Sequence, residues 1–338
     1  MSAEPTISLC MIVKNEEEHL GGCLDNARPF VDEIIVVDTG STDRTVEIAS
    51  AAGAKVFHYP WQDDFAAARN ESLAHASGEW VLTLDADERL TSGSGELMRK
   101  LVREPGVVAY NVKLVCPTQH DRGMVRLGWF PRLFRTGVGA SFEGIVHEQI
   151  TPSLAGKGEI RYSEITLDHT GYLKSPDEMR AKAERNIGLL ERQVSEDPQY
   201  SLGWFHLAET YSTVGRLDEA VGAYRKAIYL SVINDNTFSD GIAAVAYQNM
   251  GAVLLLQGRR DEGIAALEKA LRLKPDLPGA HVSLGQAAFQ KQEYETAVER
   301  FRLAHGNALP DSLERLAPDF IPEVLKDPFD GMPLRFRK

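Results

Sequence analysis

A spacing of 34 residues in the carboxyl-terminal half constrains the fold more than any other feature of the sequence. Gly251 and Gly285 lie 34 residues apart, and small or bulky residues follow each of them at matching offsets. The surrounding segment is rich in alanine, leucine, glutamate and arginine, with few β-branched runs. A repeat of this length indicates helix pairs that stack on one another, because a single pair cannot bury its own apolar face.

Three units of this repeat align, and their positions are those of tetratricopeptide repeats, which the segment therefore resembles. The first unit has Trp204, Leu207, Ala208, Tyr211, Ala220, Tyr224 and Ala227; the second has Gly251, Leu254, Gly263, Leu267, Ala270 and Pro275; the third has Gly285, Ala288, Ala297, Phe301 and Ala304. The small residues should let paired helices approach closely. Units one and two are nine residues further apart than one period, and Asn234 to Ile242, rich in turn formers, is the expected insertion.

The amino-terminal part has a different pattern, in which short apolar runs alternate with helix-like segments. The runs are Ile7–Val13, Glu33–Val37, Ala54–His58 and Trp80–Leu84, and the helix-like segments include Thr45–Ala52 and Ala66–Ala76. This alternation favours a mostly parallel sheet with helices on both faces. The predicted fold class is therefore an α/β domain followed by an all-α repeat array.

These patterns predict four segments along the chain. Residues 1–175 should form the α/β domain, and residues 176–200 a connecting and capping helix, because apolar residues between Pro176 and Asp197 recur at helical spacing. Residues 201–312 should hold about three repeats. Residues 313–338 should form an extension, because Leu309–Lys338 contains five prolines.

The charge balance and the cysteines limit the partners and the compartment. The chain has 37 lysines and arginines against 49 acidic residues, a net charge of −12, which is the wrong sign for wrapping nucleic acid. Met1–Leu20 contains Glu4 and Lys14, so it indicates neither a signal peptide nor a membrane span. Cys10, Cys23 and Cys116 have no CxxC spacing, so no disulfide framework is predicted and a reducing cytoplasm is expected.

Polar residues follow the predicted strands where each strand ends. Lys14, Asn15 and Glu16 follow the first strand, Asp38 ends the second, and Asp85-Ala86-Asp87 follows the fourth. Ligands of open α/β sheets gather beyond the carboxyl ends of the strands. These three strand ends are therefore expected to face one crevice.

The triplet Asp85-Ala86-Asp87 offers two carboxylates on a tight turn. Mg²⁺ or Mn²⁺ takes oxygen ligands of this kind and can be shared with a nucleoside diphosphate. The alternative is a solvated turn, because aspartate is common in turns.

Asp38 could accept a hydrogen bond from a nucleobase imide, and its alternative is an Asx turn. Ser41, Thr42 or Asp43 could cap the next helix, a role that we favour for Asp43.

The first 170 or so residues resemble the family 2 inverting glycosyltransferases, which have the GT-A fold, and in particular a branch fused to tetratricopeptide repeats. The matching stretches, in order, are Cys10–Glu17, Val37–Asp43, Asp64–Asn70, Leu84–Glu88, Phe130–Arg135, Gly144–Glu148 and His169–Tyr172. The resemblance implies a metal-dependent, hexosyltransferase-like enzyme. It would move a sugar from a nucleoside-diphosphate donor, with UDP expected, to a peptide, protein or glycan acceptor with inversion.

The resemblance also assigns roles to the strand-end residues. Asp38 would contact the base, Asp85 the ribose or the metal, and Asp87 the metal directly. Lys14, Asn15 and Glu16 would line the donor site. The metal would be Mn²⁺ or Mg²⁺.

The acid–base and metal assignments keep alternatives. Many relatives place the base in a Glu-Asp pair, whereas this chain has His147-Glu148 there, so Glu148 is the predicted general base and Glu143 its rival. His169 is the predicted third metal ligand, and His147 could serve instead.

Three arginines and two tryptophans are weaker candidates. Arg69, Arg132 and Arg135 could bind the diphosphate in bidentate fashion, or could form surface salt bridges. Trp61 and Trp129 could stack on a sugar or base, although aromatic residues beside strands are usually core.

Two other functions compete with sugar transfer. In one, the first domain is a catalytically silent nucleotide-sugar binder on a repeat scaffold for protein partners; the carboxylates argue against it. A nucleotide-binding oxidoreductase would need a GxGxxG turn, which Lys14–Gly21 lacks. The repeats are expected to recruit the acceptor, with a protein partner or self-association as the other possibilities.

Overall fold

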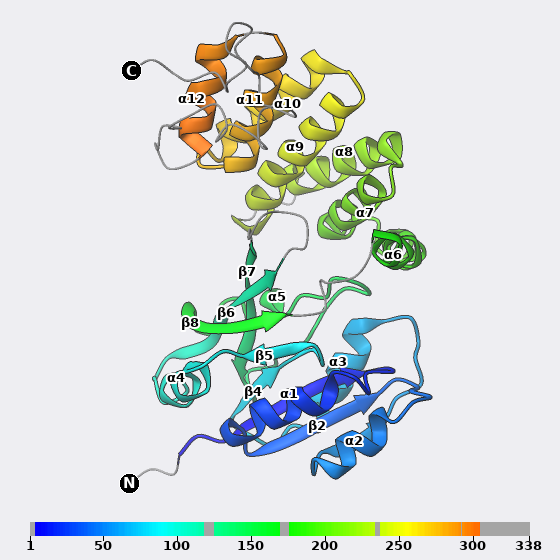
Figure 1. The fold of residues 1–338 in the computed structure, drawn as a ribbon, viewed down its shortest axis with the longest axis vertical. Helices are drawn as coiled ribbons and strands as arrows, with labels where there is room; N and C mark the ends of the chain where they lie inside the picture. The colour runs from blue at the N-terminus through cyan, green and yellow to red at the C-terminus, as the bar shows by residue number, and fades with distance from the viewer. Residues whose placement is uncertain (1–3, 118–124, 170–175, 234–236, 292, 305–338) are drawn as a thin grey trace, which may run out of the picture. The chain divides into compact units, whose positions relative to one another are not determined.

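The computed structural model describes residues 4–117, 125–169, 176–233, 237–291 and 293–304. Contacts divide the chain into two compact units, Met1–Met179 and Arg180–Lys338. Figure 1 shows strands and helices in the first unit and helices in the second. The predicted order, an α/β domain followed by an all-α array, is confirmed.

The first unit is built on an eight-stranded sheet with the order β3-β2-β1-β4-β7-β6-β8-β5. Its strands are β1 (Ile7–Val13), β2 (Glu33–Asp38), β3 (Lys55–His58), β4 (Trp80–Thr83), β5 (Glu88–Leu90), β6 (Val107–Pro117), β7 (Val125–Arg135) and β8 (Glu159–His169). The half from β3 to β4 is parallel, as predicted from the four apolar runs. The other half is mixed, because β7 is antiparallel to both β4 and β6, β8 is parallel to β6, and β5 is antiparallel to β8.

Helices cover both faces of the sheet. The helices of this unit are α1 (Leu20–Ala27), α2 (Thr45–Ala51), α3 (Phe65–Ala74), α4 (Ser94–Leu101) and α5 (Thr151–Leu154), with a 3₁₀ turn at Arg28–Phe30. Apolar residues of α1, α2 and α4 pack on one face with Leu9 and Leu82. Residues of α3 and α5 pack on the other face with Cys10 and Val81. Neighbouring residues of β1 and β4 thus point to opposite cores, which explains their continuous apolar sequence.

The second unit consists of helices in the described part of the chain. They are α6 (Pro176–Glu196), α7 (Ser201–Thr213), α8 (Leu217–Ile233), α9 (Thr237–Leu256), α10 (Arg260–Leu273), α11 (Pro278–Gln290) and α12 (Tyr294–Ala304). Helix α9 contacts α8 and α10, and also α7 and α11. The first helices of the three successive pairs, α7, α9 and α11, are here called the inner layer. No described helix combines the length and apolarity needed to cross a bilayer.

The small residues of the repeat allow close helix approach, as expected. A Cβ added to Gly251 would lie 2.7 Å from Leu267 and 2.9 Å from the carbonyl oxygen of Gly263. A Cβ on Gly263 would meet Leu255 at 2.9 Å. Glycine at both positions therefore lets α9 and α10 pack backbone to backbone.

The predicted insertion lies where expected but is not a turn along most of its length. Residues 237–242 belong to α9, which has 20 residues against 13 for α7, so the insertion lengthens a helix. Beyond it, Ile242, Ala246 and Met250 are buried at helical spacing. Burial outweighed the weak helix propensity of the polar residues. Residues 234–236 and the predicted extension 313–338 lie outside the described residues.

Candidate active site

The ends of β1 and β2 interlock through side-chain contacts with the backbone. Asn15 has a positive φ of 56°, and its side-chain oxygen accepts a hydrogen bond from the Thr42 N–H at 2.8 Å. The Asn15 N–H donates to the Ser41 hydroxyl at 3.0 Å, and the Glu16 N–H to the Thr45 hydroxyl at 2.7 Å. The two strand ends therefore form one edge.

Asp38 sits in this edge as the buried end of β2, with its side chain 5% exposed. Its carboxylate accepts hydrogen bonds from the Gly40 N–H at 3.2 Å and the Ser41 N–H at 3.0 Å, and it lies 3.3 Å from His58 Nδ1. The Asx turn is therefore present. A contact between Asp38 and a nucleobase stays a prediction.

Asp43 holds the start of α2. Its carboxylate accepts from the Thr45 N–H at 3.0 Å and from the Thr45 hydroxyl at 2.6 Å. The N-cap of α2 is Arg44, whose side chain makes no capping hydrogen bond, so the predicted N-cap at Asp43 is wrong by one residue. Asp43 instead satisfies the N–H of Thr45, the first residue of the helix, from one position before the cap.

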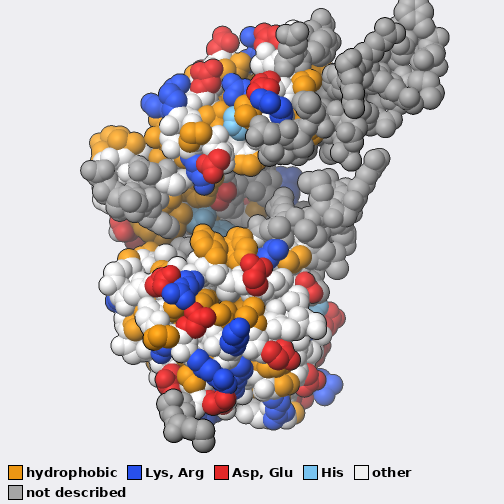
Figure 2. All heavy atoms as spheres, turned by 90° about the vertical axis from the view of Figure 1, so that its left-hand side faces the viewer, with side chains coloured by type: hydrophobic (Ala, Val, Ile, Leu, Met, Phe, Trp, Pro, Cys, Tyr) orange, Lys and Arg blue, Asp and Glu red, His pale blue; other side chains and the backbone are white. Residues whose placement is uncertain are grey.

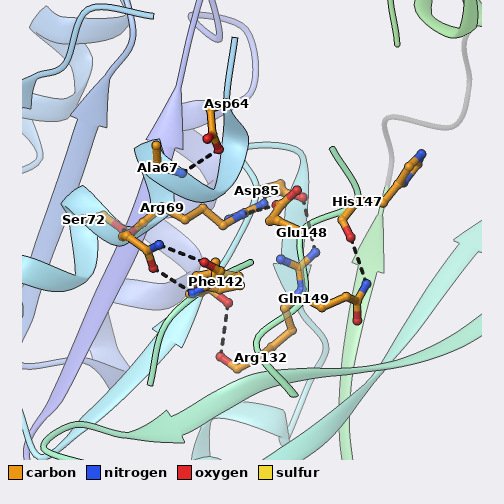
Figure 3. A network of polar contacts seen from close by, with 12 residues as sticks. Asp64, Ala67, Arg69, Ser72, Asp85, Arg132, Phe142, His147, Glu148 and Gln149 are labelled. Carbon is orange, nitrogen blue, oxygen red and sulfur yellow. Dashed lines mark hydrogen bonds and ion pairs between the residues drawn. The ribbon is translucent and has the colours of Figure 1, made fainter. Parts of the chain in front are cut away.

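The end of β4 carries a second group, centred on the side chain of Arg69. Arg69 Nη2 lies 2.8 Å from Asp85 Oδ1, and Arg69 Nε donates to Glu148 Oε1. The Arg69 side chain is 8% exposed and that of Glu148 is 13% exposed. Figure 3 shows the guanidinium reaching from α3 to both carboxylates. The predicted base and the first aspartate of the triplet therefore share one cation.

Arg132 reaches the same aspartate because of a β-bulge. Tyr110 pairs with Leu133, whereas Asn111 pairs with Pro131, so Arg132 is an extra residue in β7. Bulges re-aim a side chain out of the regular alternation. Arg132 Nη2 lies 3.3 Å from Asp85 Oδ2.

Glu88 completes this group from β5. Its fully buried side chain accepts from Arg132 Nη2 at 2.7 Å and from the Asp85 N–H at 2.9 Å. Glu88 was not among the predicted site residues, although it directly follows the Asp85–Asp87 triplet.

Burial and charge act in opposite directions in this group. Burial alone would raise the pKa of Asp85, but the positive charges and hydrogen bonds of Arg69 and Arg132 lower it well below its usual range. Burial raises the pKa of Glu88, and the Asp85 charge adds to this increase, while Arg132 opposes it. Asp85 therefore stays ionised at neutral pH, next to two charged arginines.

Two of the three predicted metal ligands are in contact. His169 ends β8 opposite Glu88 of β5, and its Nε2 lies 3.1 Å from Asp87 Oδ2. Burial lowers the pKa of His169, but the hydrogen bond and charge of Asp87 raise it above its usual value. Burial raises the pKa of Asp87, and His169 outweighs this effect and lowers it.

Asp87 and His169 offer one carboxylate and one imidazole, both of which are ligands of divalent metals. Asp85 instead directs its carboxylate to the two arginines. Within the described ranges, no group of three or more histidine, cysteine or acidic residues is placed to hold a metal. The residues present thus fit a metal that takes its remaining ligands from a bound nucleotide.

The alternative base and alternative histidine lie on the loop that carries Glu148. Glu143 is exposed, and its backbone pairs with that of Gln149 through two 2.9 Å hydrogen bonds. His147 is exposed and has a positive φ of 56°. This backbone conformation is uncommon for a residue other than glycine. The loop therefore exposes Glu143 and His147 and buries most of Glu148.

The remaining candidates lie apart from this group. Arg135 donates to the carbonyl oxygens of Val107 and Glu104, and its guanidinium lies 4.5 Å from the Trp80 ring centroid. Trp129 is 38% exposed and packs against Tyr162, so it is not a core residue. Trp61 donates to Asp63 at 2.7 Å. Lys14 is exposed.

Open α/β sheets bind ligands beyond the carboxyl ends of their parallel strands, and the first unit has its carboxylates and arginines at this edge. The fold is therefore that of an α/β ligand-binding domain followed by a helical repeat array. Residues 8–155 match the family described as "Glycosyl transferase family 2". Residues 203–231 and 250–308 each match a tetratricopeptide repeat family. The chain thus has a family 2 glycosyltransferase domain followed by tetratricopeptide repeats.

Curated relatives share parts of this chain. A TPR repeat-containing protein of Synechococcus elongatus is 37% identical over 205 residues, which cover 59% of this chain and 50% of the relative. The SPbeta prophage-derived glycosyltransferase SunS of Bacillus subtilis is 26% identical over 240 residues, covering 67% of this chain and 54% of SunS. The chain therefore spans about half the length of these curated relatives.

Two solved structures are also similar to this chain. S. aureus TarS 1–349 in complex with UDP-GlcNAc is 15% identical and has a TM-score of 0.45, with coverage of 76% of this chain and 89% of that one. Glucosyl-3-phosphoglycerate synthase from Mycobacterium tuberculosis, in complex with Mn²⁺, UDP and glucosyl-3-phosphoglycerate, is 30% identical and has a TM-score of 0.29, with coverage of 32% and 44%.

Proposed function

We propose that this protein transfers a sugar from a nucleoside diphosphate, with UDP as the expected nucleotide, to a peptide, protein or glycan acceptor with inversion. The observation that carries this proposal is the group of Arg69, Asp85 and Glu148 beyond the parallel strands of a family 2 domain. Arg69 is 8% exposed, Glu148 13% and Asp85 36%. Gathering three charged side chains in a largely desolvated place costs free energy, and a catalytic site is where such groups are expected.

The donor would lie along the ends of β1, β2 and β4. Asp38 would accept from the base, and Lys14, Asn15 and Glu16 would line the nucleotide. Asp85 would contact the ribose or the metal. Asp87 and His169 would hold Mn²⁺ or Mg²⁺, and the metal would neutralise the leaving diphosphate.

Glu148 would act as the general base. It would accept the proton of an acceptor O–H, N–H or S–H group as that heteroatom forms a bond to the anomeric carbon of the sugar. The bond from that carbon to the diphosphate oxygen would break, and its electron pair would leave with the nucleoside diphosphate. Attack from the side opposite the diphosphate inverts the anomeric carbon.

The repeats would recruit the acceptor, because helical arrays present extended surfaces of several helices. A protein partner or self-association through the repeats is the alternative use. We also propose a reducing cytoplasm as the compartment. In support, the three cysteines are buried and form no disulfide, and burial raises the pKa of Cys10 and of Cys23 to about 12.

On the face shown in Figure 2, basic and acidic side chains intermingle over the described residues, so that face offers no continuous field of one sign.

A screen of nucleotide-sugars for Mn²⁺-dependent hydrolysis tests the proposed activity without knowledge of the acceptor. The expected result is consumption of one or a few donors by the wild-type protein, and loss of that consumption when EDTA removes the metal. If UDP binds but no donor is consumed by the full chain in the presence of Mn²⁺, the silent binding domain on a repeat scaffold replaces this proposal.

A further inference from the structure

The contacts of Arg69 differ from those expected of a diphosphate ligand. A guanidinium binds phosphate in bidentate fashion through two N–H groups on one edge of its fork. In Arg69 the edge formed by Nε and Nη2 is already used, because Nε donates to Glu148 and Nη2 to Asp85. The side chain is also 8% exposed. The Nε–Nη2 edge therefore faces two carboxylates of the protein, and little of the remaining guanidinium is exposed to a phosphate.

The start of helix α3 is tied to the loop that carries Glu148. Asp64 caps the helix, accepting from the Ala67 N–H at 2.9 Å. The next residue, Phe65, donates its N–H to the Ile145 carbonyl oxygen at 2.9 Å. The first turn of α3 and the loop are thus held at one point.

Asn70 ties the same helix to the loop at a second point. Its amide donates to the Phe142 carbonyl oxygen at 2.9 Å and accepts from the Phe142 N–H at 2.8 Å. The Arg69 guanidinium lies 5.6 Å from the Phe142 ring centroid. Figure 3 shows Arg69 and Phe142 between α3 and the loop. The stretch Asp64–Asn70 therefore holds Arg69 and the Glu148 loop in one fixed arrangement. This stretch is one of those that match the glycosyltransferase family.

We propose that Arg69 is a positioning residue, which fixes the Glu148 carboxylate relative to Asp85, rather than a ligand of the donor diphosphate. This inference rests on the proposed function, in which Glu148 is the base. Asp85 keeps a second cation, Arg132, when Arg69 is replaced. Loss of Arg69 should therefore affect turnover much more than nucleotide binding.

The test compares Arg69→Gln and Arg69→Lys with Arg135→Gln as the matched control. Arg135 is also a largely engaged arginine, but it contacts carbonyl oxygens away from the carboxylates. Titration calorimetry with UDP and Mn²⁺ measures binding, and hydrolysis of the best donor from the screen measures turnover. Thermal unfolding with each variant reports whether the fold survives.

We expect both Arg69 variants to lower kcat by about 10²-fold, because a misplaced catalytic group costs roughly that much. The Kd for UDP should change by less than about threefold, since uniform binding is retained. Lysine should not restore kcat, because one ammonium group cannot reproduce the simultaneous contacts of the guanidinium with Glu148 and Asp85. Arg135→Gln should leave kcat within about twofold.

A double variant, Arg69→Gln with Glu148→Gln, tests whether the two residues act as a unit. Its kcat should equal that of Glu148→Gln alone, because residues that act through one another are not additive. A large rise in the Kd for UDP with kcat unchanged would assign Arg69 to the diphosphate, and full activity of Arg69→Lys would show that charge alone suffices. Either result overturns the inference and leaves the proposed function in place.

A measurement that needs no turnover separates the two proposals. Amide hydrogen exchange over residues 142–149 should rise about tenfold or more in Arg69→Gln, while exchange in α1 stays unchanged. If the wild-type protein consumes no donor, the proposed function fails. In that case, unchanged amide exchange in Arg69→Gln also contradicts the positioning role. Faster exchange supports the conclusion that Arg69 holds the Glu148 loop in place.

Discussion

At the scale of single residues, three arginines with the same guanidinium have different surroundings. Arg69 contacts Asp85 and Glu148, Arg132 contacts Asp85 and Glu88, and Arg135 contacts only carbonyl oxygens and a tryptophan ring among its described partners. The first two contact three carboxylates, of which Glu88 is fully buried, Glu148 is 13% exposed and Asp85 is 36% exposed. Removing one partner of a buried ion pair costs about 3–5 kcal/mol, because the other charge is left uncompensated. Arg69 and Arg132 are therefore coupled to the site, whereas Arg135 is not.

Glu148→Gln should retain donor binding and slow hydrolysis of the donor by about 10²-fold or more, the effect of losing a positioned base. Glutamine keeps the size of the side chain and can still accept from Arg69. Calorimetry with UDP and Mn²⁺ and steady-state hydrolysis measure the two effects separately.

The matched control is Glu143→Gln on the same loop. Glu143 is exposed, so this variant should hydrolyse the donor at nearly the wild-type rate. The opposite pattern, a slow Glu143→Gln and an active Glu148→Gln, would move the base to Glu143.

Asp87→Asn should lose the Mn²⁺-dependent part of UDP binding, because the site would lose its charged ligand beside His169. Asp168→Asn is the control, since Asp168 is an exposed neighbour of His169 on β8. Calorimetric titration with UDP, with and without Mn²⁺, measures the effect. Equal affinity of a folded Asp87→Asn and the wild type would remove Asp87 from the metal site.

At the scale of elements, Glu33 joins the starts of several strands. Its carboxylate, at the start of β2, accepts from Ser8 of β1, from Lys55 of β3 at 2.8 Å, and from the Ser77 N–H before β4 at 2.6 Å. Burial would raise the pKa of Glu33, but these hydrogen bonds outweigh it and lower the pKa to about 2. The ionised carboxylate therefore holds the parallel half of the sheet together.

Glu33→Gln should consequently show a pH-dependent loss of stability. The pKa of Glu33 is lower in the folded state than its ordinary value of 4.5, so its contribution is complete above about pH 4.5 and disappears as the pH falls toward 2. At pH 7 the variant should lose roughly 1–3 kcal/mol of the free energy of unfolding. Urea unfolding of the variant and the wild type between pH 2.5 and pH 7 measures the difference in their free energies of unfolding. This pH interval contains the ordinary pKa of a glutamate.

Glu47→Gln is the control for this prediction. Glu47 pairs with Arg44, and both side chains are 74% exposed, so the pair should contribute little at any pH. If the difference between Glu33→Gln and the wild type stayed constant down to pH 2.5, the carboxylate would not be the source of the stability.

The sequence predicted the elements whose signals are local. The apolar runs identified β1 to β4, and the repeat offsets identified the helix pairs. Strands β6, β7 and β8 are longer and were not predicted, because polar and charged residues interrupt them and they lack the short continuous apolar runs that mark β1 to β4. The bulge at Arg132 depends on the pairing of β7 with β6, so no local pattern could have revealed it.

The same difference of range applies to the site. The positions of Asp38, Asp85 and Asp87 at strand ends follow from alternating apolar and polar segments, and the structure has them there. The contact between Arg69 and Glu148 joins residues 79 positions apart, and only the folded chain reveals it. The sequence motifs predicted both residues as site residues but did not predict that they bind each other.

At the scale of the whole molecule, the catalytic candidates all belong to the first unit, and the repeats add none in the described residues. Helices α7, α9 and α11 form the inner layer of the repeats, and Glu209 of α7 accepts from Asn249 of α9 at 3.3 Å. A Cβ added to Gly279 of α11 would lie 2.9 Å from Gln248 of α9. The inner layer therefore carries half-buried polar side chains from successive repeats, and this is the layer that we propose recruits the acceptor.

The last prediction separates chemistry from recruitment. Gln286 and Gln290 are exposed, one turn apart on α11. Changing both to arginine should leave donor hydrolysis unchanged and raise the KM for transfer to the native acceptor by about tenfold, with kcat nearly constant, the signature of lost uniform binding. The matched control changes Glu268 and Arg272, exposed one turn apart on α10 outside the inner layer, to glutamine, and should leave KM unchanged. An unchanged KM in the α11 variant, with a change in sedimentation of the protein instead, would assign the inner layer to self-association.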